Sequence, residues 1–188
     1  CRLLAEIRAR YSSAEVTLRV DANGAFSPEE VLEKGERLSE FDVHSIEQPI
    51  AAGQLEAMRK LCGQTPIPIA LDEELIGVLD AADKAALLDE IEPQYIILKP
   101  SLLGGFTAAE AWIALAEARN IGWWVTSALE SNIGLNAIAQ WTATQNTFMP
   151  QGLGTGGLFT NNIDSPLVAE KGVLRYNNAL SWDTKYIR

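Results

Sequence analysis

The sequence predicts an α/β protein with a parallel sheet, and more specifically part of a (β/α)8-type, TIM-like barrel. Its main feature is a repeat in which short apolar or β-branched runs each end in a polar residue. These end residues fall at positions 21, 47, 72, 99 and 127, so the intervals are 26, 25, 27 and 28 residues. An interval of this size holds one strand and one helix, which is the repeat of a βα unit.

The five runs have the length and composition of buried strands. They occupy residues 16–20, 43–46, 67–71, 95–98 and 123–126, and a sixth possible strand lies near residues 149–152. Strands that alternate with helices at this spacing are parallel, with right-handed crossovers. A complete barrel has eight strands and typically about 250 residues. We therefore expect a partial barrel of about six βα units whose first strands precede Cys1.

The segments between the runs carry the signals of helices. Ser27-Pro28-Glu29-Glu30 predicts a capping box with proline at the first helical position, and Thr107-Ala108-Ala109-Glu110 predicts a second box. Apolar residues follow both motifs at the 3.6-residue spacing of an amphipathic helix. Helices with weaker start signals are expected at residues 54–62, 80–91 and 132–144.

The repeat is lost from about Asn161. Two short apolar runs on either side of Glu170-Lys171-Gly172 predict a small hairpin, formed by residues 167–168 and 173–176. We therefore divide the chain into residues 1–160, which form a partial barrel with the polar strand ends, and residues 161–188, a C-terminal extension expected to pack outside it.

The composition narrows the classes of function. Of 188 residues 47% are apolar, and 15 Lys and Arg stand against 25 Asp and Glu, which gives a net charge of −10. This acidity argues against a nucleic-acid partner. No apolar run approaches the ~20 residues that cross a bilayer, so we expect no membrane partner. Two cysteines and no signal segment indicate a reducing, cytoplasmic location.

Acidic residues end three consecutive strands of the predicted sheet. Parallel strands end at one edge, where barrel enzymes keep their chemistry, so Asp21, Glu47 and Asp72 are expected to converge. Three carboxylates repel one another unless a cation lies among them. Oxygen ligands favour Mg²⁺, with Mn²⁺ possible, and a lone His44 argues against zinc. The alternative is a non-catalytic α/β binding protein with solvated acids at its strand ends.

Four motifs resemble, in order and spacing, the metal-ligand and lysine strands of the enolase superfamily in its muconate-cycloisomerase-like branch. They are Arg19-Val20-Asp21-Ala22-Asn23, Ile46-Glu47-Gln48-Pro49, Leu71-Asp72-Glu73 and Leu98-Lys99-Pro100. The resemblance covers roughly residues 1–160. Within that branch, residues 126–131, the pair Gly134-Leu135 and the loop 151–154 are most similar to the o-succinylbenzoate synthase family of menaquinone biosynthesis.

The resemblance implies a role for each matched position. Asp21, Glu47 and Asp72 would bind Mg²⁺. Lys99 would be the catalytic residue that faces the reaction intermediate. As a cation, this lysine would stabilise the intermediate. The substrate would be a small-molecule carboxylate, and the positions implied for shaping its site are Arg19, Asn23, Ser127 and Gly152.

The implied reaction removes a proton next to a carboxylate, passes through an enediolate and expels water from a cyclohexadiene carboxylate, so the enzyme would be a carbon–oxygen lyase. In this family the proton is taken by the second lysine of a Lys-x-Lys motif, which is absent from the 188 residues. The repeat places that motif just before Cys1, and the amino-terminal capping domain is expected there too. N-succinylamino-acid racemase, dipeptide epimerase and muconate-type cycloisomerase are alternatives on the same scaffold.

Two further signals are weaker. Gly152-x-Gly154-x-x-Gly157 matches a dinucleotide fingerprint as a string, but no helical pattern follows it. Glu73 and Glu74 directly follow Asp72 and are expected to be either alternative ligands or outer-shell groups of the metal site, or ordinary solvated charges at the strand ends.

Overall fold

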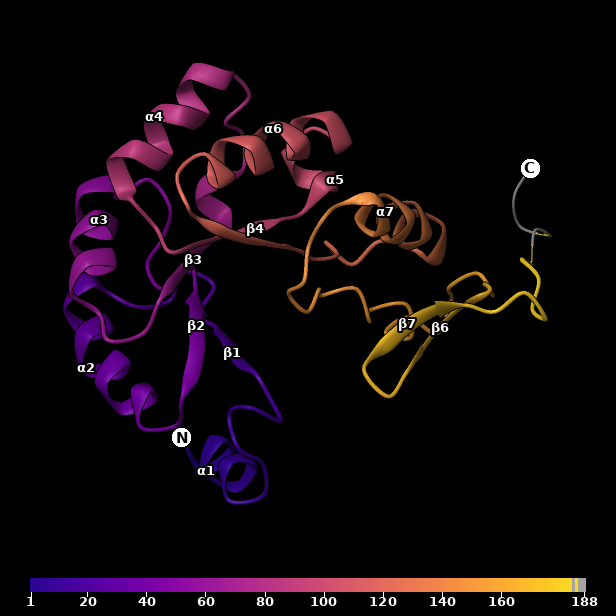
Figure 1. Cartoon of the computed structure of the whole chain (residues 1–188), viewed down its shortest axis with the longest axis horizontal. Helices are drawn as coiled ribbons and strands as arrows, with labels where there is room; N and C mark the ends of the chain where they lie inside the picture. Colours follow the sequence, from indigo (N-terminus) through magenta and orange to yellow (C-terminus); the bar gives the residue numbers. More distant parts are fainter. Residues whose placement is uncertain (184, 186–188) are drawn as a thin grey trace. The chain divides into compact units, whose positions relative to one another are not determined.

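The computed structural model describes residues 1–183 and 185, and it is an α/β fold (Figure 1). Each of the five predicted runs overlaps a strand, and the strands form one sheet in the order β1-β2-β3-β4-β5. The pairs β1–β2, β2–β3 and β3–β4 are parallel, as predicted. The strands are β1 (Leu18–Asp21), β2 (Val43–Glu47), β3 (Ile69–Leu71), β4 (Tyr95–Leu98) and β5 (Gly122–Val125).

Helices separate the strands along the chain. Their bounds are α1 (Arg2–Arg8), α2 (Pro28–Ser39), α3 (Leu55–Gln64), α4 (Ala81–Ile91), α5 (Pro100–Leu103), α6 (Phe106–Glu117) and α7 (Asn132–Thr144), with a 3-10 turn, η1, at Glu73–Leu75. The expected helices at residues 54–62, 80–91 and 132–144 therefore correspond to α3, α4 and α7. The strand–helix alternation that the repeat predicted is confirmed.

One of the two predicted capping boxes is confirmed and the other is wrong. At α2, the Ser27 side chain accepts a hydrogen bond from the Glu30 amide, and the Glu30 side chain accepts one from the Ser27 amide. At α6, the helix already begins at Phe106, so Thr107 lies inside its first turn. Gly104 and Gly105 precede it with φ of 96° and 92°. These left-handed glycines, and not a threonine cap, set the start of α6.

The chain divides into two compact units, the first of which contains Cys1–Ile97 and Glu110–Trp123. In this unit α2, α3 and α4 lie beside one another along strands β1–β3 (Figure 1). Its fully buried side chains include Ile69, Leu71 and Trp112. The buried Lys84 ammonium lies 5.5 Å from the centre of the Trp112 ring, a cation–π contact that offsets part of the cost of burying this charge.

The second unit contains Leu98–Ala109 and Trp124–Arg188. Its predicted hairpin is confirmed: β6 (Leu167–Glu170) and β7 (Val173–Tyr176) are antiparallel. The two residues between them, Lys171 and Gly172, have φ of 51° and 75°, as the tight hairpin turn requires. The possible sixth strand near residues 149–152 is reduced to a single parallel bridge between Thr126 and Gly152. That residues 161–188 pack outside a barrel stays a prediction.

Two further observations bear on function. Among residues 1–183 and 185, no helix combines the length and apolar character needed to cross a membrane. No helix follows Gly157 in the described part of the C-terminal region, so the glycine string there lacks the strand–turn–helix context of a dinucleotide site.

Candidate functional site at the strand ends

Backbone register aligns the three predicted acidic ligands within the first unit. Asp21 and Glu47 are the last residues of β1 and β2 and lie directly opposite each other. Glu47 is in turn opposite Ala70 on β3, and Asp72 follows two residues later, directly after that strand. The three residues therefore occupy neighbouring positions at the carboxyl edge of three adjacent parallel strands.

The three carboxylates differ in environment. Asp21 is exposed, Glu47 is half-buried and Asp72 is only 3% exposed. The Asp21 side chain accepts a hydrogen bond of 2.8 Å from the backbone amide of Asn23, which has φ of 46°. The predicted neighbour Asn23 thus orients the first carboxylate through its main chain.

The chemistry of this donor set fits a hard divalent cation, because it offers carboxylate oxygens from three adjacent strands. The three residues are aligned by the backbone register of the strands, but their side chains do not converge. In the part of the chain that the structure describes, no group of three or more His, Cys, Asp or Glu residues is close enough to hold a metal ion. Mutual repulsion of like charges favours such separation. The metal role of these residues stays a prediction.

Arg19 brings positive charge to the same region. Burial lowers the pKa of its guanidinium, while the nearby Tyr95 and Glu47 act in the opposite direction. The His44 ring lies 4.8 Å from the ring of Tyr95, centre to centre. Burial, together with the charge of Arg19, lowers the pKa of His44. His44 is therefore favoured in its neutral form as a packed ring.

A buried network at the ends of β2 and β3 joins Gln48, which the sequence marked only as part of a motif, to Glu74, for which a metal-site role was one expectation. Gln48 is fully buried, and its amide nitrogen donates to the Ile50 carbonyl (3.0 Å) and to the Glu74 carboxylate (3.1 Å). Its amide oxygen accepts from the backbone N–H groups of Asp72 (3.1 Å) and Glu74 (3.2 Å). Glu74 is 5% exposed and accepts a further bond of 2.8 Å from the Gly53 amide.

This network corrects the interpretation of Glu74 as an ordinary solvated charge. Both of its carboxylate oxygens accept hydrogen bonds from the protein, and the side chain is buried. The only signal in the sequence was its position two residues after Asp72, which does not show where the side chain goes.

Lys99 belongs to the second unit. It directly follows β4, is half-buried, and occupies the cap position of the short helix α5. Its carbonyl accepts hydrogen bonds from the amides of Leu102 (2.8 Å) and Leu103 (3.1 Å). The first turn of a helix therefore fixes the main chain of Lys99, while its catalytic role stays a prediction.

Ser127, at the end of β5, forms hydrogen bonds within its own loop. Its hydroxyl donates to the Glu130 carboxylate (2.6 Å) and accepts from the Leu129 amide (2.9 Å). Glu130 also accepts from the Ser101 hydroxyl (2.5 Å) and the Ala128 amide (3.1 Å). Partial burial disfavours the charged form of Glu130, but the hydrogen bonds outweigh it and lower the pKa of this carboxyl. In the sequence, Glu130 lies within the matched segment 126–131 and had no predicted role of its own.

Gly152 lies against the same strand end. Its amide donates to the Val125 carbonyl (2.8 Å), and its carbonyl accepts from the Ser127 amide (3.1 Å). A Cβ at this position would lie 2.8 Å from the Cβ of Thr126, closer than packing allows. The close approach of the two backbones explains the glycine. Its predicted contribution to substrate binding stays a prediction.

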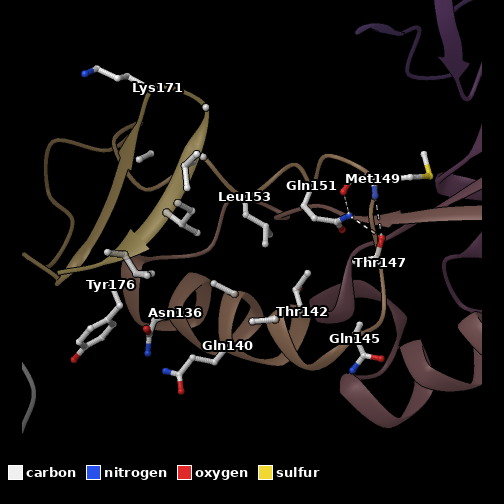
Figure 2. A pocket seen from close by; sticks show the side chains of 18 residues that line it. Asn136, Gln140, Thr142, Gln145, Thr147, Met149, Gln151, Leu153, Lys171 and Tyr176 are labelled. Atoms are coloured by element: carbon white, nitrogen blue, oxygen red, sulfur yellow. Dashed lines mark hydrogen bonds between the residues drawn. The ribbon is translucent and has the colours of Figure 1, made fainter. Parts of the chain in front are cut away.

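A cavity of about 750 Å³ lies elsewhere in the second unit, between α7 and the β6–β7 hairpin (Figure 2). Its lining includes Asn136, Gln140, Leu153 and Tyr176. Gln151 at its margin donates to the Thr147 hydroxyl at 3.3 Å. None of the predicted site residues lines this cavity, so it does not define the candidate site.

A parallel sheet with acidic residues at the ends of three consecutive strands defines the class of α/β proteins to which this chain is compared. Residues 1–179 match the enolase C-terminal domain-like family, and the chain is a member of that family. The resemblance to the enolase superfamily inferred from the four motifs is therefore confirmed.

Individual relatives are more specific. The chain is 59% identical to the o-succinylbenzoate synthase of Desulfotalea psychrophila over 174 residues, which are 93% of this chain and 47% of the relative. The crystal structure of MenC from D. psychrophila superposes with a TM-score of 0.88 at 59% identity, over 93% of this chain and 49% of that one. The chain is also 36% identical to the N-succinylamino acid racemase of Thermus thermophilus over 126 residues, which are 66% of this chain and 33% of the relative. The chain thus spans about half the length, or less, of these relatives.

Proposed function

We propose that the protein is a Mg²⁺-dependent o-succinylbenzoate synthase, a carbon–oxygen lyase that expels water from a cyclohexadiene carboxylate to form an aromatic product. The observation that carries this proposal is the register of Asp21, Glu47 and Asp72 at three adjacent strand ends. The 59% identity to the synthase of D. psychrophila selects this activity within the family. We further propose that the five-stranded sheet is part of a (β/α)8-type barrel.

Asp21, Glu47 and Asp72 would hold Mg²⁺, or Mn²⁺ in its place. When bound, the ion supplies positive charge that stabilises the negative charge developing on the substrate carboxylate as the neighbouring proton leaves. The Asn23 amide holds the Asp21 carboxylate in one orientation, which reduces the reorganisation needed for binding. Arg19, whose charge is close to Glu47, would help to orient a substrate carboxylate.

Lys99 would lie opposite the general base. Its ammonium group, which is a cation, would stabilise the negative charge on the reaction intermediate. Its main chain is fixed by the start of α5, so the side chain extends from an anchored point. Removing a proton next to a carboxylate doubles the local negative charge, and an ammonium ion close to it lowers the barrier. This role requires a charge and not a second proton acceptor.

Ser127, with neighbouring backbone groups, would hold the distal carboxylate of the substrate. The Ser127 hydroxyl now donates to Glu130, so binding would require this hydroxyl to turn from Glu130 to the substrate. A hydroxyl can do so by rotation about one bond, without moving the main chain. Gly152 was expected to leave room for the substrate, but Thr126 already lies where a Cβ would be, so the contribution of this glycine would be to let its loop approach the end of β5 closely.

The test is an assay of the natural protein that contains residues 1–188, with the cyclohexadiene substrate, Mg²⁺ or EDTA, and Asp72→Asn as the matched variant. We expect o-succinylbenzoate to form with Mg²⁺ and not with EDTA or in the variant. Turnover that persists in EDTA, or none with Mg²⁺, would overturn the proposal.

The identity to the racemase of T. thermophilus makes N-succinylamino acid racemisation the second candidate. The same samples distinguish the two activities when N-succinylamino acids are offered. Racemisation at a higher kcat/KM than dehydration would make the racemase activity primary.

A further inference from the structure

Gln48 touches the chain next to all three proposed metal ligands. It directly follows Glu47, and its carbonyl accepts a hydrogen bond of 2.7 Å from Gly24, three residues after Asp21. Its backbone amide donates to the Ala70 carbonyl (2.9 Å), and its side chain accepts from the Asp72 amide (3.1 Å). One residue therefore connects the ends of β1, β2 and β3.

The Gln48 side chain uses its full hydrogen-bonding capacity. A carboxamide has two N–H donors and an oxygen that accepts two bonds. The donors reach Ile50 and Glu74, and the acceptor takes the amides of Asp72 and Glu74. The backbone of Gln48 has φ of 35°, an unfavourable value for a residue with a side chain. The four bonds offset this strain and select a single orientation.

Glu74 completes the arrangement from the opposite side. One carboxylate oxygen accepts from Gln48 and the other from the Gly53 amide, so both are directed at protein donors. Asp72, two residues earlier, contributes its backbone amide to this network. The two acidic residues thus have separate tasks: Glu74 supports the loop that presents Asp72.

We infer that Gln48 and Glu74 are positioning residues that set the affinity of the protein for its divalent cation by fixing the main chain of Asp72 relative to Glu47. The inference rests on the proposed function. Metal affinity depends on the groups that hold the ligands, and loss of such a group typically weakens it about 10–100-fold.

The experiment measures Mn²⁺ binding by calorimetry, without substrate, in the natural protein containing this chain, with Gln48→Glu, Glu74→Gln and the double exchange as variants. Gln48→Glu replaces the amide that donates to Glu74 at 3.1 Å with a carboxylate, so two carboxylates then face each other. We expect Mn²⁺ binding to weaken about tenfold or more, although negative charge is added. Glu74→Gln should also weaken binding. The amide nitrogen of the new side chain would face either the Gln48 amide nitrogen or the Gly53 backbone N–H, which are both donors.

The exchange keeps the net charge and restores the side-chain bond with its direction reversed. At Ile50 it replaces the donor from Gln48 with a carboxylate oxygen that faces the carbonyl, so we expect recovery to be partial: binding should be stronger than in either single variant if Asp72 is repositioned. Gln54→Glu is the matched control: this exposed glutamine lies in the same loop and should leave binding unchanged. Melting temperatures in EDTA report stability separately.

The outcomes distinguish the alternatives. Tighter binding in Gln48→Glu would show a long-range charge effect, and unchanged binding with a lower melting temperature would show a merely structural role; either overturns the inference. If Gln48→Glu does not fold, Glu74→Gln and the exchange decide on the same criteria. If wild type binds no Mn²⁺, the proposed function and the inference both fail. Binding that is lost in Asp72→Asn but unaffected in the Gln48 and Glu74 variants overturns the inference alone.

Discussion

Two strand-end regions, one in each compact unit, use the same device with different partners. In the first unit, the Glu74 carboxylate accepts from the Gln48 amide group and the Gly53 backbone. In the second, the Glu130 carboxylate accepts from the hydroxyls of Ser101 and Ser127 and from a backbone amide. Each carboxylate holds a loop that follows a strand and carries a proposed site residue.

The donors make the two regions differ in adaptability. An amide N–H can only donate, whereas a hydroxyl can rotate and either donate or accept. Glu74 is also buried, while Glu130 is half-buried. The first region is therefore suited to hold metal ligands at fixed positions, and the second can exchange a hydrogen bond with a substrate.

Replacing Lys99 should have the largest effect on catalysis, and it separates chemistry from metal binding. Lys99→Ala in the natural protein is expected to lower kcat by about 10²–10³-fold, with a smaller change in KM, because the charge acts during the reaction. Mn²⁺ affinity should stay within about threefold of wild type. Lys99→Arg should restore little activity, since guanidinium is larger and planar. Near-normal kcat in Lys99→Ala would remove this residue from the mechanism.

The next largest effect is on stability, and it compares Glu74 with Glu130 by replacing each with glutamine. Glu74→Gln should lower the free energy of unfolding by about 2–3 kcal/mol, because an amide N–H then faces a donor that cannot rotate into an acceptor. Glu130→Gln should cost about 1 kcal/mol or less, because the Ser101 and Ser127 hydroxyls can reverse direction. Urea denaturation measures both.

Glu56→Gln, at an exposed residue paired with Lys60, is the control for loss of a surface charge. Equal costs at Glu74 and Glu130 would contradict the distinction between a fixed and an adaptable region.

The smallest effect is a pH dependence confined to the second region. The pKa of Glu130 is lowered from its ordinary value of 4.5, so its ionised form stabilises the fold. This contribution is fully present above pH 4.5 and is lost as the pH falls through the lower folded-state pKa. The melting-temperature difference between wild type and Glu130→Gln should therefore shrink below pH 4.5. A difference that grows on acidification would contradict the direction of this shift.

Periodicity was enough to predict the sheet and most of its helices, because apolar spacing records which face each element buries. It could not predict the start of α6, which depends on two left-handed glycines, or the reduction of residues 149–152 to one bridge. Periodicity also could not predict the contact between Gln48 and Glu74. These residues are 26 positions apart, and their contact depends on one positive φ angle and two side-chain orientations.

Binding of Mn²⁺ to wild type and to Asp21→Asn, Glu47→Gln and Asp72→Asn tests the central claim most directly, since the claim is that these three carboxylates share one ion. Calorimetry should give one Mn²⁺ per chain in wild type. Each variant should bind at least about 100-fold more weakly, a larger effect than that of the groups that support the ligands, and Glu130→Gln should bind like wild type. Wild-type affinity in any one of the three variants would contradict the account.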